Sequence, residues 1–486
     1  MKKVHFIGIC GTGMGSLAGL FRAAGWDVRG SDRAIYPPMS QLLADLDIPV
    51  MEGFSPAHLD WSPTLVVVGN IARPDNPEAT EARRRGLPCT SMAAALEDHF
   101  LVDRHVVVVA GTHGKTTTTA LLAWALEGAG RDPGYLIGGV PAHAGGRSFR
   151  LGGGDLFVIE GDEYETAFFD KGPKFLHYRP RTAILTSIEL DHVEVFEDLA
   201  ALETAFRQFV ALLPADGRLI ACTDDDRVVA VTRTAVAPVV SYGLGGTAAV
   251  RGVTLEVGRD GMTFEIHRRD EPAQRLHSPL TGDHNLRNLV ATAECLRGLG
   301  LTDTEIAAGL ASFPGVRRRQ EIRGEIGEVT IMEDFAHHPT AVRETLHGVR
   351  LRFRGRRLVA VFEPRTNSSR RSLFQEAYAA AFDDADAAII AAVDQPQRAP
   401  ADDRLDPYRL AADVTRRGTP ATHLPTVSEI LGHLTTTVTA GDVVLVLSNG
   451  AFGGLLDNLL AALQSRLDQG ADGASTAAAS DASPTR

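Results

Sequence analysis

Short apolar runs that alternate with helical stretches are the feature that most restricts the fold of this 486-residue chain. Each run is long enough for one buried strand, and together they occupy residues 4–9, 65–68, 105–110, 155–160, 181–188, 329–334, 357–362, 387–393 and 442–447. Strands of this kind, separated by helices, are typical of parallel sheets that helices cover on both faces. We therefore predict an α/β fold.

The length predicts two or three domains, because a chain this long rarely has a single core. We place boundaries near Asp103 and Pro314-Gly315, which gives domains at 1–103, 104–314 and 315–468. Two alternating segments on either side of Asp260-Gly261 predict a β-hairpin in the second domain. Residues 469–486 are rich in Ala, Ser, Gly and Asp, so we expect a disordered tail.

Composition excludes several classes of function. The formal charge is −12 and no long basic run occurs, which argues against nucleic acid as a partner. No apolar stretch approaches the roughly 18 residues of a membrane span. The four cysteines are scattered, which argues against a zinc site or disulfides and indicates a reducing compartment. Glycines interrupt the apolar start of the chain, so we predict no signal peptide and a cytoplasmic protein.

A glycine-rich loop between a strand and a helix is the strongest motif. It follows the apolar run 106–110 and reads Gly111, Thr112, His113, Gly114, Lys115, Thr116, Thr117. Backbone amides at such a turn bind phosphate oxygens. Lys115, which we expect in a solvent-facing loop, would reach the β- and γ-phosphates, and the Thr116 hydroxyl would take a magnesium position. Val109 stands where the full P-loop pattern has Gly.

Two further candidates follow strands of the same domain. Glu160 closes the run 155–160, and His192 follows the run 181–188. Ligand groups gather at the carboxyl ends of parallel strands, so both side chains could complete a magnesium site with Thr116. Magnesium prefers oxygen donors, which makes an imidazole ligand less usual.

A second glycine-rich loop, Gly8 to Gly13, follows the first strand. With Ser31-Asp32 about 20 residues on, it resembles a dinucleotide-binding fingerprint. Cys10 replaces the second fingerprint glycine, so a tight strand-to-helix turn is the alternative interpretation.

The motifs together resemble the Mur ligase family, in the family's order and over nearly the whole chain except the tail. They are the segments 111–117, 160–163, 188–192, 282–288, 318–319 and 334–339. The resemblance implies a three-domain architecture, with a Rossmann-like N-terminal domain, a central P-loop ATPase domain and a Rossmann-like C-terminal domain. It also implies an ATP-dependent ligase that forms a C–N bond through an acyl phosphate.

The resemblance further implies roles for single residues. Thr116, Glu160 and His192 would bind Mg²⁺, and the segment 202–206 has no Lys that could become carbamylated. Asn285 and Asn288 would contact the adenine, Asp334 the ribose and Arg319 the transferred phosphate. We also assign His337 to the active site. The N-terminal loop would hold the diphosphate of a UDP-sugar, with the contact residues Gly11, Thr12, Gly13, Met14, Ser31, Asp32 and Asn70.

Two branches of this family share such an N-terminal domain; one attaches L-alanine to UDP-N-acetylmuramate and the other attaches L-alanyl-γ-D-glutamyl-meso-diaminopimelate. The segments 10–12, 36–40, 363–367 and 448–454 are similar to the tripeptide branch, which serves peptidoglycan recycling. We assign the peptide to Arg365, Asn367, Ser448 and Asn449, because Arg365 can bind a carboxylate bidentately and the others offer neutral hydrogen bonds.

Three alternatives remain at this point. The nearest is the L-alanine-adding branch. An NAD(P)-dependent oxidoreductase would use the Gly8 loop but leaves the Gly111 loop without a role, and a P-loop switch protein would lack ligase chemistry. The sequence leaves the oligomeric state open.

Overall fold

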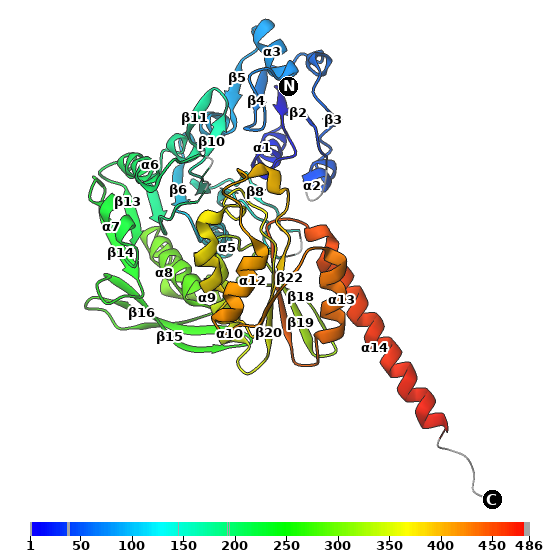
Figure 1. The fold of residues 1–486 in the computed structure, drawn as a ribbon. Coiled ribbons are helices and arrows are strands. Elements are labelled where there is room, and N and C mark those ends of the chain that lie inside the picture. The colour runs from blue at the N-terminus through cyan, green and yellow to red at the C-terminus, as the bar shows by residue number, and fades with distance from the viewer. Residues whose placement is uncertain (1, 36–38, 144, 192, 194, 481–486) are drawn as a thin grey trace, which may run out of the picture. The chain divides into compact units, whose positions relative to one another are not determined.

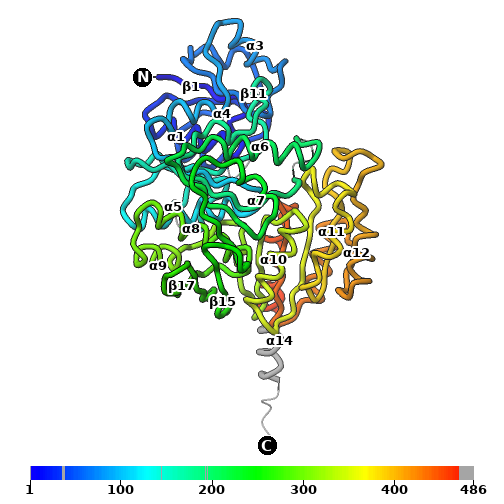
Figure 2. The backbone as a smooth tube through the Cα atoms, turned by 90° about the vertical axis from the view of Figure 1, so that its left-hand side faces the viewer, coloured from blue at the N-terminus to red at the C-terminus, as the bar shows by residue number. Residues whose placement is uncertain are grey.

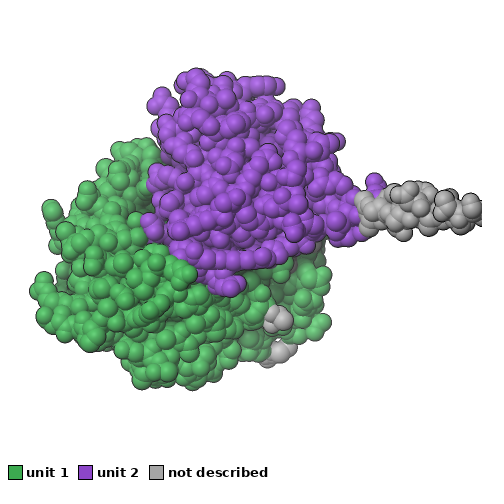
Figure 3. All heavy atoms as spheres, turned by 90° about the horizontal axis from the view of Figure 1, so that it is seen from below, with its two compact units in different colours: residues 1–256, 262–280, 284–317 green, residues 257–261, 281–283, 318–486 purple. Residues whose placement is uncertain are grey.

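The computed structural model describes residues 2–35, 39–143, 145–191, 193 and 195–480, with side chains up to residue 469. The described chain divides into two compact units (Figure 3). Unit 1 comprises residues 1–256, 262–280 and 284–317, and unit 2 comprises 257–261, 281–283 and 318–486. No helix in the described part is long and apolar enough to cross a membrane.

A parallel sheet in the order β3-β2-β1-β4-β5 opens unit 1 (Figure 1). Its strands are β1 (Lys3–Ile7), β2 (Asp27–Asp32), β3 (Val50–Glu52), β4 (Leu65–Val68) and β5 (Cys89–Ser91). Successive side chains of β1 point to opposite faces. Phe6 joins the core that includes residues of α1 (Thr12–Ala23) and α4 (Met92–Leu96), whereas Ile7 joins residues of α3 (Pro77–Arg84).

The second sheet of unit 1 has the order β17-β16-β15-β14-β13-β12-β6-β9-β7-β8. Its parallel centre includes β6 (His105–Ala110), β9 (Leu156–Gly161), β12 (Thr182–Leu185), β13 (Arg218–Cys222) and β14 (Val239–Gly243). The other members are β7 (Gly134–Leu136), β8 (Phe149–Arg150), β15 (Val250–Gly258), β16 (Gly261–Arg268) and β17 (Gln274–Ser278), and β10 (Glu165–Ala167) and β11 (Asp170–Pro173) form a separate hairpin.

The remaining helices of this part are short to medium in length. They are α2 (Met39–Asp45), α5 (Lys115–Gly128), α6 (Leu199–Ala211), α7 (Asp226–Thr232), α8 (Asp283–Gly298), α9 (Asp303–Ala311), and the short turns η1 (Pro56–Leu59), η2 (Glu97–Leu101) and η3 (Lys174–His177). The first two sheets share one unit because their cores are continuous. The ring of Phe149 packs where a Cβ on Gly19 of α1 would stand, and Ser16 and Ser148 form a 2.6 Å hydrogen bond.

The sheet of unit 2 has the order β18-β19-β23-β20-β21-β22, and only β18 is antiparallel among these described strands. They span β18 (Glu321–Ile326), β19 (Val329–Asp334), β20 (Leu358–Phe362), β21 (Ala387–Ala391), β22 (Ala421–Leu424) and β23 (Val443–Leu447). Phe362 packs on one face with α10 (Pro339–Arg352), α11 (Gln375–Ala381) and α12 (Pro407–Arg416), which lie next to one another (Figure 2). Val361 packs on the other face with α13 (Val427–Thr437) and α14 (Leu455–Ser480).

The predicted α/β class and most of the predicted strands are confirmed. The runs 65–68, 105–110 and 329–334 are β4, β6 and β19 to the residue, and β15 and β16 form the predicted hairpin. The short turns η4 (Ser372–Phe374), η5 (Pro396–Arg398) and η6 (Phe452–Gly454) complete unit 2.

The predicted tail begins inside the last helix, because the backbone of α14 is helical to Ser480. The expectation of disorder for residues 469–486 stays a prediction. Alanine is the best helix former, and the tail contains several alanines, which gives a physical reason for the continuation. Residues 481–486 of the expected tail lie outside the described residues.

Candidate functional site

The loop from Gly111 to Lys115 leaves β6 and enters α5 through two positive-φ glycines. Gly111 has φ +129°, and a Cβ there would lie 2.1 Å from the Thr186 hydroxyl oxygen. Gly114 has φ +83°, and a Cβ there would lie 2.4 Å from Asn288 Oδ1. Only glycine fits these positions without strain. The first turn of α5 contains no acidic residue, so its N–H groups form a favourable site for an anion.

A second loop, which follows β12, braces the glycine-rich loop. Thr112 N donates to Ser187 O at 2.8 Å, and His113 N donates to Ser187 Oγ at 3.1 Å. The Thr186 hydroxyl donates to His113 O at 2.6 Å, and His113 Nε2 lies 2.7 Å from Glu189 Oε2. Hydrogen bonds within the protein therefore hold the conformation of the loop.

Lys115 is held inside the loop rather than in solvent, which corrects the solvent-facing position expected from the sequence. Its Nζ donates to Gly111 O at 2.7 Å and lies 2.9 Å from Glu163 Oε2, and the Lys115 side chain is only 12% exposed. Burial opposes the charge of this ammonium, but the carboxylates of Glu163 and Asp162 outweigh burial and raise the pKa of Lys115. The lysine is therefore a fixed positive charge beside the amides of α5.

Thr116 and Glu160 lie together at the ends of α5 and β9. The Thr116 hydroxyl donates to Glu160 Oε2 at 3.1 Å, and Gly138 N donates to Glu160 Oε1 at 2.5 Å. Both residues are buried, Glu160 at 7% exposure. A hydroxyl and a carboxylate side by side are the oxygen donors that Mg²⁺ prefers, so these residues fit the predicted metal. His192, the third predicted ligand, lies outside the described residues.

Asn285 and Asn288 lie on one face of α8. Asn288 Nδ2 donates to Asn285 Oδ1 at 3.3 Å, and both side chains are 5% exposed. Because Asn288 Oδ1 also lies against Gly114, α8 packs directly on the glycine-rich loop. This places both asparagines near the loop, while their contact with adenine stays a prediction.

The N-terminal loop is held from behind by the end of β2. Gly8 N and Ile9 N donate to Ser31 O at 2.8 and 3.1 Å, and Cys10 N donates to Asp32 Oδ2 at 2.9 Å. Of the residues predicted to bind the UDP-sugar, Gly11, Thr12 and Asn70 are exposed and Gly13 is half-buried, whereas Met14, Ser31 and Asp32 are buried. The segment 36–38 of the tripeptide-branch similarity lies outside the described residues.

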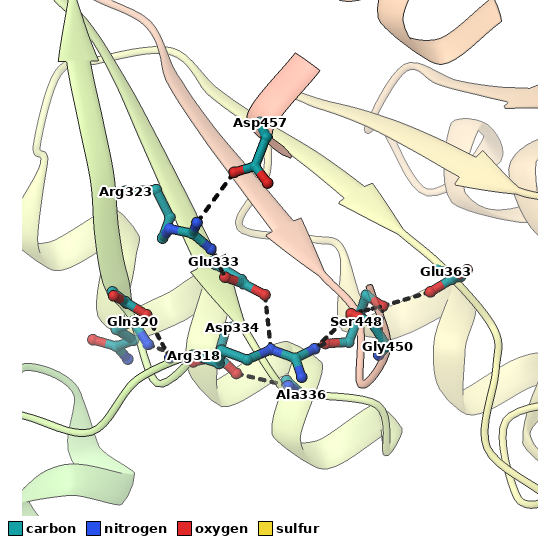
Figure 4. A network of polar contacts seen from close by, with 11 residues as sticks. Arg318, Gln320, Arg323, Glu333, Asp334, Ala336, Glu363, Ser448, Gly450 and Asp457 are labelled. Atoms are coloured by element: carbon teal, nitrogen blue, oxygen red, sulfur yellow. Dashed lines mark hydrogen bonds and ion pairs between the residues drawn. The ribbon is translucent and has the colours of Figure 1, made fainter. Parts of the chain in front are cut away.

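In unit 2, hydrogen bonds of Arg318 and Asp334 hold two segments in place (Figure 4). Arg318 lies just before β18, and Asp334 is the last residue of β19. Arg318 Nε donates to Glu333 at 2.7 Å, and its Nη2 donates to the carbonyl oxygens of Ser448 and Gly450 at 2.8 and 2.7 Å. Asp334 accepts backbone N–H groups from Gln320 and Ala336, both at 2.7 Å.

Burial raises the pKa of Asp334, although the charge of Arg319 lowers it in part. The Arg319 guanidinium lies 4.8 Å from the centre of the Phe335 ring. His337 Nδ1 lies 3.1 Å from Phe335 O, and the His337 carbonyl accepts the Tyr378 hydroxyl. The neighbouring His338 caps α10. The roles predicted for Arg319, Asp334 and His337 stay predictions.

The residues predicted to bind the peptide meet at the carboxyl ends of β20 and β23. The Ser448 hydroxyl donates to Glu363 Oε2 at 2.5 Å and accepts from Gly450 N at 2.9 Å. Arg365 is 35% exposed and lies 3.9 Å from both Glu363 Oε1 and Asp394 Oδ2. Burial raises the pKa of Glu363, against the opposing effects of the Ser448 bond and the Arg365 charge.

Asn367 and Asn449 complete this group. Asn367 Oδ1 accepts from the buried Arg370 at 3.1 Å, and Arg370 also donates to Asp394 O at 2.6 Å. Asn449 Oδ1 is buried and has no hydrogen-bond partner among the described residues, so it is available to a ligand donor.

Sequence reasoning did not assign roles to Glu163, Glu363, Arg370 or Asp394. Asp394 could have been found, because it follows the predicted strand 387–393 and ligand groups gather at such ends. Glu163 and Glu363 belong to the segments 160–163 and 363–367, but the residues that they contact are distant in sequence. No local sequence pattern around Arg370 indicates a role for it.

The sequence matches three patterns of one family. The pattern described as Mur ligase family, catalytic domain, matches residues 3–103, the Mur ligase middle domain matches 109–296, and the Mur ligase, glutamate ligase domain, matches 318–450. These segments correspond to the five-stranded, the ten-stranded and the six-stranded sheet.

Curated relatives span almost the whole chain. A UDP-N-acetylmuramate–L-alanyl-γ-D-glutamyl-meso-2,6-diaminoheptandioate ligase of Escherichia coli K12 is 37% identical over 470 residues, covering 96% of this chain and 99% of the relative. The enzyme of the same name from Haemophilus influenzae is 34% identical, covering 95% and 99%. A UDP-N-acetylmuramate–L-alanine ligase of Salinibacter ruber is 36% identical, covering 94% and 96%.

Solved structures show the same architecture. A murein peptide ligase of Psychrobacter arcticus superposes with a TM-score of 0.70 at 34% identity, covering 96% of this chain and 99% of that chain. A UDP-N-acetylmuramate–alanine ligase of Thermotoga maritima gives 0.79 at 22% identity, covering 96% and 100%, a likeness that shows the fold alone.

Proposed function

This chain belongs to the Mur ligase family, and from that premise we propose that it joins UDP-N-acetylmuramate to L-alanyl-γ-D-glutamyl-meso-diaminopimelate with ATP, as a murein peptide ligase in peptidoglycan recycling. The observation that carries the choice of amine substrate is the near full-length similarity to two ligases with that substrate in their names. We further propose a cytoplasmic location, small-molecule partners and no stable nucleic-acid or membrane partner.

The central loop supplies the nucleotide chemistry in this proposal. The N–H groups of α5 and the Lys115 ammonium bind the ATP phosphates. Asn285 and Asn288 lie close to the loop and contact the adenine. Thr116 and Glu160, with His192, would hold Mg²⁺. A Mg²⁺ ion held there would supply positive charge near the transferred phosphoryl group, which would lower the barrier of phosphoryl transfer.

The reaction proceeds in two transfers. The lactyl carboxylate of UDP-N-acetylmuramate attacks the γ-phosphorus of ATP, ADP leaves, and an acyl phosphate forms. The peptide's α-amine then attacks the acyl carbon, and inorganic phosphate leaves with the bonding electron pair. Lys115 and Arg319 offset the charge on the transferred phosphoryl group, so the protein acts mainly by positioning and electrostatics. The amine must lose a proton, and its reference pKa of about 8 makes partial deprotonation sufficient.

The peptide binds at the ends of β20 and β23 in this proposal. Arg365 faces a peptide carboxylate, and the neighbouring carboxylates of Glu363 and Asp394 keep the guanidinium in place. Asn449 Oδ1 accepts a peptide N–H, because a buried acceptor without a partner is costly. Asn367 is held by a hydrogen bond from Arg370, and Ser448 is held by its hydrogen bond to Glu363.

The second candidate is the L-alanine-adding activity, because the Salinibacter ruber relative with that name is nearly as similar. Family membership leaves no support for the oxidoreductase and switch-protein alternatives. The test is phosphate release by the purified protein with ATP, Mg²⁺ and UDP-N-acetylmuramate, with either the tripeptide or L-alanine as amine, and product identification by mass. We expect release to need all substrates and kcat/KM to favour the tripeptide. Preference for L-alanine would select the second candidate, and release without an amine would contradict ligation.

A further inference from the structure

Glu78 is a fully buried carboxylate that none of the proposed ligand contacts uses. It lies in the first turn of α3, where Asn76 caps the helix by accepting from Glu78 N at 3.0 Å. Burying an ionised carboxylate is costly unless donors satisfy it. The groups around Glu78 therefore determine whether its carboxyl group is ionised and which residues it holds in place.

Two donors meet each oxygen of this carboxylate. Oε2 lies 3.0 Å from His5 Nε2 and accepts the Ser31 hydroxyl at 2.5 Å. Oε1 accepts Ser55 N at 3.1 Å and lies 2.7 Å from His58 Nδ1. Burial opposes ionisation, but the bonds from His5 and Ser31 outweigh burial and lower the pKa of Glu78. A carboxylate can accept all four bonds at once, whereas an amide of the same shape cannot.

The residues that Glu78 holds are those that shape the N-terminal loop. Ser31 O accepts from Gly8 N and Ile9 N, the next residue Asp32 accepts from Cys10 N, and His5 precedes the loop on β1. The Ser31 side chain is 0% exposed, and its hydroxyl donates to Glu78 behind the loop. Glu78 thus connects α3, η1, β1 and β2 behind the loop.

We propose that Glu78 is a positioning residue for the sugar nucleotide: by holding Ser31 and His5, it sets the Gly8–Cys10 backbone so that the amides at the start of α1 face the diphosphate. This proposal rests on the proposed function, specifically on the N-terminal loop as the UDP-sugar site. An apolar side chain in place of Glu78 would fill the same space but would leave Ser31, Ser55 N and both imidazoles without their acceptor.

The test compares Glu78→Gln, Ser31→Ala and the double variant with Glu81→Gln as the matched control. Glu81 lies on the same helix, but its carboxylate pairs with Arg84 and Arg85 at the surface. For Glu78→Gln we expect the KM of UDP-N-acetylmuramate to rise about tenfold, the loss of roughly one charge-assisted hydrogen bond. The KM values of ATP and the tripeptide, and kcat, should stay within about twofold, since those interactions lie on other elements.

The double variant distinguishes positioning of the N-terminal loop through Ser31 from a general loss of protein stability. If Glu78 acts through Ser31, Ser31→Ala raises the same KM, and the double variant is no worse than Glu78→Gln alone. A lower melting temperature with an unchanged KM for UDP-N-acetylmuramate would overturn the proposal. Should Glu78→Gln fail to fold, Ser31→Ala decides, and an unchanged KM there also overturns it. Failure of the wild-type protein to bind UDP-N-acetylmuramate would instead refute the proposed function, and this inference with it.

Discussion

The ammonium of Lys115 lies 2.9 Å from Glu163 Oε2, within the loop that we propose for the ATP phosphates. Both side chains are largely buried, at 12% and 3% exposure. The salt bridge and the bond to Gly111 O hold the lysine in the loop, so ATP meets a positive charge that is already in position. Arriving phosphate oxygens would share this ammonium with Glu163 or replace the carboxylate.

This relationship predicts that Lys115→Ala loses both ligation and stability. Removing one partner of a buried pair leaves an uncompensated charge, which costs about 3 kcal/mol of unfolding free energy. Lys115→Ala combined with Glu163→Gln should regain most of that stability while staying inactive, because the phosphate-binding charge is still missing. Urea unfolding and phosphate release measure the two effects. Ligation by Lys115→Ala at a near wild-type rate would contradict the nucleotide assignment.

The fold could largely be predicted because its central strands are continuous apolar runs. Strands β4, β6 and β19 are buried at nearly every position, so the local sequence identifies them. The edge strand β22 reads Ala-Thr-His-Leu and is half-exposed, and only pairing with β21 makes it a strand. The sequence therefore predicts the interior of the sheets better than their edges.

In the candidate site, too, contiguous motifs can be predicted from the sequence, whereas contacts between distant residues cannot. The loop from Gly111 to Thr117 is contiguous, and its motif predicts both its position and its conformation. Asn288 lies against Gly114 from 174 residues further along the chain. Glu163 is within a recognised motif, but its pairing with Lys115 depends on the parallel neighbours β6 and β9. Such contacts follow from tertiary structure, which no single segment specifies.

The Glu160–Thr116 contact predicts a magnesium-dependent phenotype. Glu160→Gln should raise the Mg²⁺ concentration for half-maximal activity, because an amide oxygen binds a hard cation less strongly than a carboxylate. Glu165→Gln is the matched control, since Glu165 is exposed on β10. Titrations of phosphate release against Mg²⁺ at saturating substrates compare the variants. Equal Mg²⁺ requirements in wild type and Glu160→Gln would contradict the metal assignment.

The burial pattern of the C-terminal helix α14 predicts where the chain can be shortened without loss of stability. Leu459 and Leu463 of α14 are buried in the core of unit 2, whereas Leu467 is 47% exposed. Ending the chain after Asp468 keeps the buried leucines, so activity and melting temperature should remain nearly unchanged. Ending it after Leu459 removes Leu463 and should lower the melting temperature by several degrees. A clear destabilisation by the first truncation would show that the segment beyond Asp468 contributes to the fold.

The peptide site yields the most specific prediction, because Gly450 and Arg365 are in contact. Arg365→Ala should weaken tripeptide binding by about 1.5–3 kcal/mol, the loss of a charge-assisted bond, and Arg365→Lys should restore only part of it. Among the residues that the structure describes, the ion pairs of the guanidinium are those of 3.9 Å with Glu363 and Asp394, so little stability should be lost. The KM values of ATP and UDP-N-acetylmuramate should barely change.

Gly450→Ala tests the role of the Arg365 guanidinium in peptide binding without removing that side chain. A Cβ on Gly450 would lie 2.5 Å from Arg365 Nε, Cζ and Nη1, so the flexible arginine must move. The backbone of Gly450 should stay in place, since Arg318 and Ser448 bond to it. We expect a selective rise in the tripeptide KM, smaller than that of Arg365→Ala. Gly432→Ala on α13 is the control, because nothing lies within 4 Å of its Cβ position. If Gly450→Ala and Arg365→Ala both leave the tripeptide KM and kcat unchanged, Arg365 does not bind the peptide.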